Sequence, residues 1–190
     1  AARPPGRGSS RDSVSLPVEI SAVAERVKQK ANRLGALMPG EEHIVHMPAH
    51  IYYRVGMYRE SLETNKRAMA VDERYFASSA SDPLYKAAYY PHNIHFLMVS
   101  AQIGGDGPAA IAAAQKLDAS MAPEVVAQFA IMQPVKAAPY TTHAQFSAPE
   151  TILALPTPVA GLVLVETMYR YARAVAYAQQ RKAAAAQQEI

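Results

Sequence analysis

The chain has 190 residues, a formal net charge of +3, no cysteine, and hydrophobic residues at 50% of its positions. This length suits one domain with a core or a short array of repeats, and the lack of thiols excludes disulfides and thiolate metal ligands. No basic stripe with interleaved aromatic residues is present, so we expect no nucleic-acid binding. The longest apolar run, 152–165, is broken by two prolines and a glycine, and we expect no membrane span.

Alanine-rich segments such as 109–114 and 183–186 favour helices, because alanine has the highest helix propensity of all residues. The chain has 4 Phe and no Trp, and it lacks the alternating β-branched residues that are typical of strands. We therefore predict an all-α protein. No hydrophobic signal segment is visible near the N-terminus, so a cytoplasmic protein is expected.

The N-terminal half divides into an arm and helices. Residues 1–17 are rich in Pro, Gly and Ser and predict a disordered or loosely docked arm, with the folded domain covering 18–190. The first helix is expected from Val18 until Pro39-Gly40 ends it. A second helix is expected to begin close to Pro48, since proline is favourable at the first helical position, and to end at Gly56.

Further helices are predicted along the rest of the chain. The third covers about 58–76, the fourth begins at or before Pro91, and the fifth covers about 108–121. Two more helices are expected on either side of 134–140. The last stretch, 162–188, is compatible with one long helix or with two helices broken near Gln180. Successive short helices with brief connections indicate antiparallel helical hairpins.

The sequence contains an internal repeat with an offset of 49 residues. At this offset a pair of histidines spaced three apart, a turn glycine and an apolar helix position all recur. The matched positions are His43 with His92, His46 with His95, Gly56 with Gly105, and Leu62 with Ile111.

The segment GMYRESLETNKRAMAVD, 56–72, resembles the turn and second helix of the tetratricopeptide repeat. Gly56 matches the turn, Leu62 the large apolar position and Ala68 the small packing position. Residues 169–187 are similar to a third copy with Gln180 in place of the turn glycine. The resemblance implies a short right-handed solenoid of stacked antiparallel hairpins.

The segments HIVHMPAHI and PHNIHF are similar to patterns in a group of bacterial tetratricopeptide-repeat proteins. Relatives in that group are considerably longer, which implies that this chain is a piece of a longer array. Uncovered ends of such an array predict self-association into a homo-oligomer.

Five histidines lie in these two segments. In tetratricopeptide repeats the first helix of each hairpin lines a concave groove, and the resemblance places these histidines on such helices. Residues three, four or seven apart share a helix face. Imidazoles from two helices are therefore candidate ligands of one transition metal ion, namely Zn, Cu, Fe or Ni. The candidate ligands are His43, His46, His50, His92 and His95.

Two functions remain open from the sequence. The first is a binding or scaffold protein whose groove receives a peptide, a protein segment or a small ligand. Tyr53, Tyr89 and Arg170 are then additional contacts, with Arg170 suited to a carboxylate. The second is a metalloprotein, either a hydrolase or an oxidase, in which the histidines hold the ion. No catalytic residue is assigned, and the sequence leaves open whether the protein is an enzyme.

Overall fold

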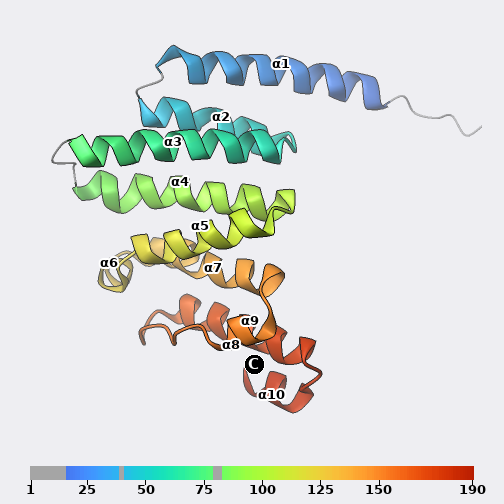
Figure 1. Ribbon diagram of the computed structural model, residues 1–190, viewed down its shortest axis with the longest axis vertical. Coiled ribbons are helices and arrows are strands. Elements are labelled where there is room, and N and C mark those ends of the chain that lie inside the picture. The colour runs from blue at the N-terminus through green and yellow to red at the C-terminus, as the bar shows by residue number, and fades with distance from the viewer. Residues whose placement is uncertain (1–15, 39–40, 79–82) are drawn as a thin grey trace, which may run out of the picture.

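The computed structural model describes residues 16–38, 41–78 and 83–190, and within these ranges it contains helices and no strand. The prediction of an all-α protein is therefore confirmed for the described residues. The first five helices run antiparallel to one another and stack in chain order (Figure 1). These helices are α1 (Leu16–Leu37), α2 (Glu42–Arg54), α3 (Tyr58–Ser78), α4 (Pro83–Gly104) and α5 (Gly107–Ser120).

The second half of the chain continues the stack with shorter elements. Helix α7 packs against α5 and α4, α9 packs against α7, and α8 and α10 pack against α9. Of the two alternatives for 162–188, the structure has two helices, α9 and α10, with the break near Gln180. The elements are α6 (Pro123–Gln128), the short 3-10 helix η1 (Ala130–Met132), α7 (Gln133–Phe146), α8 (Pro149–Leu153), α9 (Val163–Gln179) and α10 (Ala183–Gln188).

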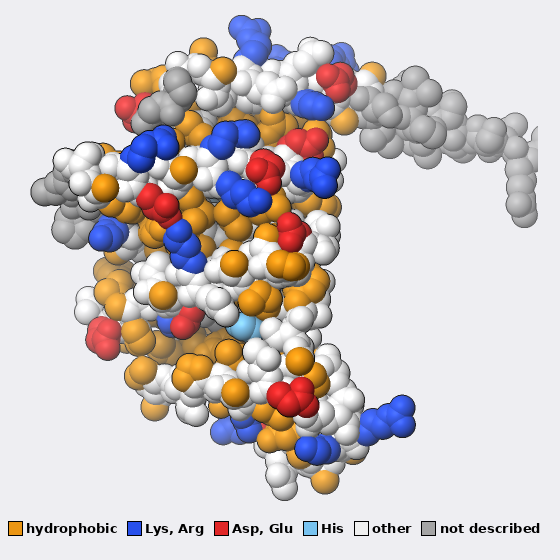
Figure 2. All heavy atoms as spheres, viewed as in Figure 1, with side chains coloured by type: hydrophobic (Ala, Val, Ile, Leu, Met, Phe, Trp, Pro, Cys, Tyr) orange, Lys and Arg blue, Asp and Glu red, His pale blue; other side chains and the backbone are white. Residues whose placement is uncertain are grey.

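Charged side chains are unevenly distributed on the surface. Figure 2 shows that Lys, Arg, Asp and Glu gather mainly over α1–α3 on the face in view, in the upper part of the picture. Across the part of the chain that the structure describes, no helix is both long and apolar enough to cross a membrane.

Two boundaries predicted from prolines are wrong. Helix α2 begins at Glu42 and continues through Pro48, which is buried inside the helix. Proline in a helix removes one backbone hydrogen bond and crowds the carbonyl four residues earlier, and its ring also needs space against the neighbouring helix. Gly35 of α1 supplies that space, because a Cβ atom at Gly35 would lie only 3.3 Å from Pro48 Cγ. Likewise, 134–140 does not separate two helices but belongs to α7, which contains Pro139.

The expected arm falls largely outside the described residues, since 1–15 are not described. Helix α1 begins at Leu16, two residues before the boundary expected between the arm and the folded domain.

The turns between hairpin helices repeat one hydrogen-bond pattern. Gly56 N–H donates to Tyr53 O, and the next amide, Met57 N–H, donates to Tyr52 O at 2.8 Å. The same two bonds recur 49 residues later at Gly105 and Asp106. Both glycines have positive φ, 79° and 78°, as this helix-ending turn requires. The predicted repeat is therefore present in the backbone of these two turns.

A third turn of the same kind connects α9 to α10. Arg181 N–H donates to Ala178 O, and Lys182 N–H donates to Tyr177 O, both at 2.9 Å. The residue with positive φ is Arg181, at 59°. The predicted alignment, which put Gln180 at this position, is wrong by one residue. No glycine marks the turn in the sequence, so the alignment had no local signal to fix it.

Adjacent glycines at the end of α4 provide a test of this turn. We expect Gly105→Ala to lower the free energy of unfolding by about 1 kcal/mol, because only its positive φ disfavours a side chain. A Cβ atom at Gly105 meets nothing within 4 Å. Gly104→Ala is the matched control: Gly104 is the last residue of α4, and its added Cβ would make ordinary contact with Tyr58 at 3.4 Å. Urea denaturation should show no loss of stability for Gly104→Ala, and equal losses in both variants would contradict the argument.

The hydrophobic core runs between α3, α4, α5, α7 and α9. Ile94 and Met98 of α4 and Leu117 of α5 have no exposed surface at all. A smaller cluster around Ile152 joins α7, α8 and α9. Between α2, α3 and α4 the buried side chains are partly polar. Ser61 Oγ, for example, bonds to Ser100 Oγ at 2.8 Å. Polar side chains of α3 therefore form part of the contact between these three helices.

Candidate metal centre

Three imidazole nitrogens converge between α2 and α4. His46 Nε2 lies 2.9 Å from His50 Nε2, one turn further along α2, and 3.1 Å from His92 Nε2 of α4. All three ligand atoms lie within 4.8 Å of one another. His46 is fully buried, whereas His50 and His92 are half-buried. The three side chains therefore lie close enough together to bind one metal ion.

Asn65 of α3 fixes the orientation of the buried imidazole. Its Nδ2 donates to the Ser61 carbonyl at 2.9 Å, so its Oδ1 accepts a hydrogen bond from His46 Nδ1 at 2.8 Å. The proton of neutral His46 is therefore on Nδ1, and the lone pair of Nε2 faces the other two histidines. Metal-binding histidines in proteins are commonly held this way, with the second ring nitrogen bonded to a carbonyl or carboxylate oxygen.

Burial keeps these imidazoles uncharged. It is the largest effect lowering the pKa of His46 from 6.5 to about 4, and repulsion from His92, His50 and His43 acts in the same direction, against the bond to Asn65. The pKa of His50 is also lowered, chiefly by burial. A neutral imidazole is the form that binds a metal. These two rings are consequently in the ligating form at neutral pH.

The dimensions fit a small divalent ion. Two nitrogens bound at about 2.0–2.1 Å to one tetrahedral ion lie about 3.3 Å apart. The two distances from His46 Nε2 are slightly shorter than this, so small side-chain rotations would bring these two pairs of nitrogens to the required spacing. Three nitrogen ligands without sulfur suit Zn, Cu, Fe or Ni.

An aromatic residue forms one wall of the group. The Phe96 ring lies 4.4 Å from the His50 ring, 5.4 Å from the His46 ring and 5.9 Å from the His92 ring, measured between centroids. The Tyr53 ring also packs against Phe96, at 5.2 Å between centroids. Tyr53 therefore supports the wall and is not a member of the nitrogen group.

Two of the five candidate histidines lie outside the group. His43 is exposed, and its ring is 6.3 Å from the His46 ring and edge-on to Tyr89 at 5.8 Å. His95 is half-buried on α4, and burial lowers its pKa, with His92 adding to the effect. It is not among the three converging ligand atoms.

The remaining predicted contacts are dispersed. Tyr89 is 47% exposed and stacks on Tyr85 at 5.3 Å. Arg170 is exposed on α9 and lines a separate cavity with Tyr171 and Ile190, in which no histidine takes part. The expectation that Arg170 shares one groove with the histidines receives no support from this placement.

Sequence reasoning missed the residues that orient the site. Asn65 lies three residues after Leu62 and four before Met69, both of which are buried. A polar residue at a position where the helical spacing predicts an apolar one was the sequence signal that could have identified Asn65. The buried Asp72, seven residues further on, accepts bonds from Asn93 Nδ2 at 3.0 Å and from the Tyr85 hydroxyl at 2.7 Å. One buried face of α3 thus holds both the His46 ring and the α4 segment next to His92.

Searches of protein-family models, curated proteins and solved structures gave no match to this chain.

We expect the metal-free protein to lose stability as the pH falls from 6.5 to 4. His46 has a pKa of about 4 when folded and 6.5 when unfolded, so the unfolded state binds more protons in this interval. One pKa unit corresponds to about 1.4 kcal/mol, so His46 contributes up to about 3 kcal/mol. Urea denaturation with a chelator present, at pH 4.5 and 7, should show a smaller pH effect in His46→Ala than in the wild type. An identical pH effect in both proteins would contradict this origin.

Proposed function

We propose that this chain is a helical metalloprotein that binds one transition metal ion, with zinc as the first ion to test. Nε2 of His46, His50 and His92 would be the three ligands. The observation that carries the proposal is the convergence of three ring nitrogens around a buried imidazole whose tautomer Asn65 fixes. A structural role for these histidines would not require three nitrogens to face one point.

The most suitable reaction class for this arrangement is hydrolysis. A divalent ion with three protein ligands and one open position lowers the pKa of a water bound there and supplies a nucleophile near neutral pH. The protein's own residues would hold the ion, keep His46 in the correct tautomer, and exclude bulk water with the Phe96 ring. An oxidase with a redox-active metal is the other reading of the same ligand set.

Metal content and affinity test this proposal. Protein purified without chelator or nickel resin should contain close to one equivalent of zinc per chain, and the chelated protein should take up one equivalent on titration. The double variant His50→Ala/His92→Ala should lose this binding. His95→Ala is the matched control, because His95 lies on α4 one turn from His92 but outside the group. Equal zinc binding in all three proteins would refute the proposed site.

A second candidate function is binding of a peptide, a protein segment or a small ligand on a tetratricopeptide-like solenoid. The repeated turn geometry at Gly56, Gly105 and Arg181 supports the solenoid. The exposed apolar side chains of Phe129 and Ile131 support a binding surface. Under this proposal the histidines are polar contacts of the bound ligand.

A further inference from the structure

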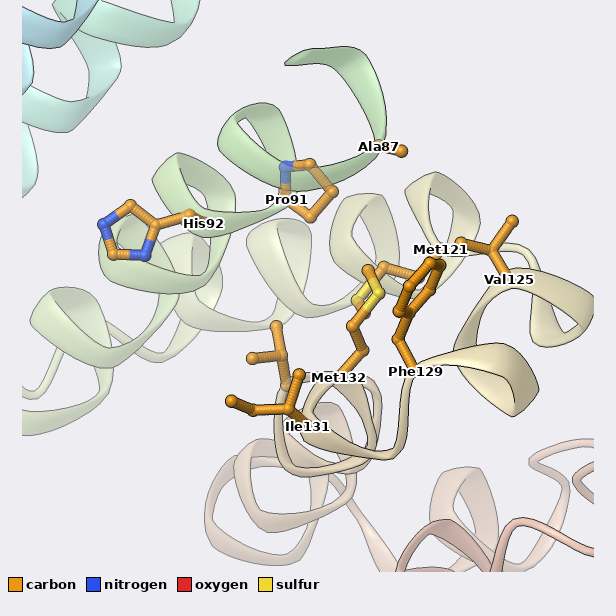
Figure 3. A pocket seen from close by; sticks show the side chains of 9 residues that line it. Ala87, Pro91, His92, Met121, Val125, Phe129, Ile131 and Met132 are labelled. Carbon is orange, nitrogen blue, oxygen red and sulfur yellow. The ribbon is translucent and has the colours of Figure 1, made fainter. Parts of the chain in front are cut away.

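An apolar cavity of about 300 Å3 lies between α4 and the segment that joins α6 to α7. Ala87, Pro91 and His92 of α4 form one wall, and Phe129 and Met132 come from the opposite side (Figure 3). In Figure 3 His92 lies at one end of the cavity with its ring turned away from the other labelled side chains, and Phe129 and Val125 lie at the other end. The cavity is small but within the range of ligand sites in proteins.

The lining is almost entirely hydrophobic. Every lining residue except His92 has an apolar side chain, so the cavity offers no charged partner for an ionic group. Two of the lining side chains are open to solvent: Phe129 is 54% exposed and Ile131 is 86% exposed. Large apolar side chains left uncovered around a hollow are typical of a binding site.

His92 belongs both to this cavity and to the three-nitrogen group. We propose that the cavity binds the aromatic or compact alkyl group of a small molecule whose carboxylate or acyl oxygen reaches the metal ion. This inference rests on the proposed function, because the lining itself offers no cation and only the ion would attract an oxygen head group.

The volume sets the size of the apolar group. A cavity of about 150 Å3 is sufficient for benzene, so this one accommodates a group of about ten carbon atoms, such as a naphthalene ring. The substrate class that we propose is therefore a small aryl or alkyl ester, amide or carboxylate. 2-Naphthoate combines the ring and the head group and is a suitable probe.

Binding of 2-naphthoate, measured by its fluorescence and by calorimetry, tests the inference. The zinc-loaded wild type should bind it, and removal of zinc should weaken binding about tenfold or more because the head group loses its partner. Ala87→Leu places three more carbons into the cavity from α4 and should weaken binding about tenfold or more, with zinc affinity unchanged. Ala112→Leu is the matched control, since Ala112 is exposed on α5 outside the cavity.

Three results of the binding measurements would overturn the inference. These are zinc-loaded protein that does not bind the probe, affinity unchanged by Ala87→Leu, and affinity unchanged by removing zinc. Failure of the proposed function is detected separately, because zinc titration without the probe would then show no binding to the wild type.

Sedimentation of the wild type and of Phe129→Ser measures whether the cavity face is instead an interface between two copies of the chain. Self-association that this change abolishes would assign the cavity face to a second copy of the chain and overturn the small-molecule proposal.

Discussion

Replacement of His46 by alanine is expected to weaken zinc binding about 100-fold or more. Structural zinc sites with four ligands are worth about 10–16 kcal/mol, so each ligand contributes about 3 kcal/mol. His46 is also the centre of the group, since both short nitrogen distances, 2.9 and 3.1 Å, involve its Nε2. Competition titrations with a chromophoric chelator, using metal-free wild type and variant, would measure the change.

The variant must be compared with a folded reference. His46→Ala leaves Asn65 Oδ1 without its donor, which costs about 1–3 kcal/mol when the acceptor is buried. Circular dichroism should nevertheless report a helical protein, because the main core around α4 and α5 is unaffected. His43→Ala, on the same helix but outside the group, should bind zinc like the wild type. If His46→Ala remains folded and binds zinc as tightly as His43→Ala, the assigned ligand set is wrong.

Truncation of Leu117 is expected to lower the free energy of unfolding by about 2–5 kcal/mol, because Leu→Ala at a buried position removes apolar contacts and leaves a cavity. Leu117 lies on α5 with no exposed surface, in the core that joins α3, α4, α5, α7 and α9. Such a loss is a large part of the total stability of a typical domain. Urea denaturation followed by circular dichroism would give the change from the midpoint at constant slope.

Leu37 provides the comparison for this truncation. It is the last residue of α1 and is 70% exposed, so Leu37→Ala removes little buried surface. We expect a change within about 0.5 kcal/mol. Equal effects at Leu117 and Leu37 would mean that the helices do not pack around the core described above.

Truncation of Leu117 is also expected to affect zinc binding. The core around Leu117 sets the position of α4, and α4 carries His92 and one wall of the apolar cavity. A partial loss of zinc affinity in Leu117→Ala, at a temperature where the variant is folded, would show that core packing contributes to the geometry of the site.

The sequence by itself determined the helical class, most of the helices and two of the turns. These are local properties: alanine content and apolar spacing favour helices, and a glycine with positive φ ends them. Gly56 and Gly105 therefore marked their turns correctly, whereas the turn at Arg181 was misplaced because no glycine indicates it. Pro48 misled the prediction, since the space that Gly35 leaves for its ring is a tertiary contact.

The sequence also identified the set of histidines from which the three converging imidazoles come, because imidazoles four apart on one helix must share a face. This is why His46 and His50 meet. Which histidine of α4 joins them was decided by the tertiary structure. His46 contacts His92, although the repeat aligns it with His95.

The physical reason is the rotation of α4 about its axis. Successive helix residues point about 100° apart, so a small rotation changes which side chain faces α2. Buried Ile94 and the bond from Asn93 to Asp72 set that rotation, and Asn65 sets the ring of His46. These contacts come from residues far apart in the sequence. The site and its neighbouring cavity therefore exist only in the folded chain.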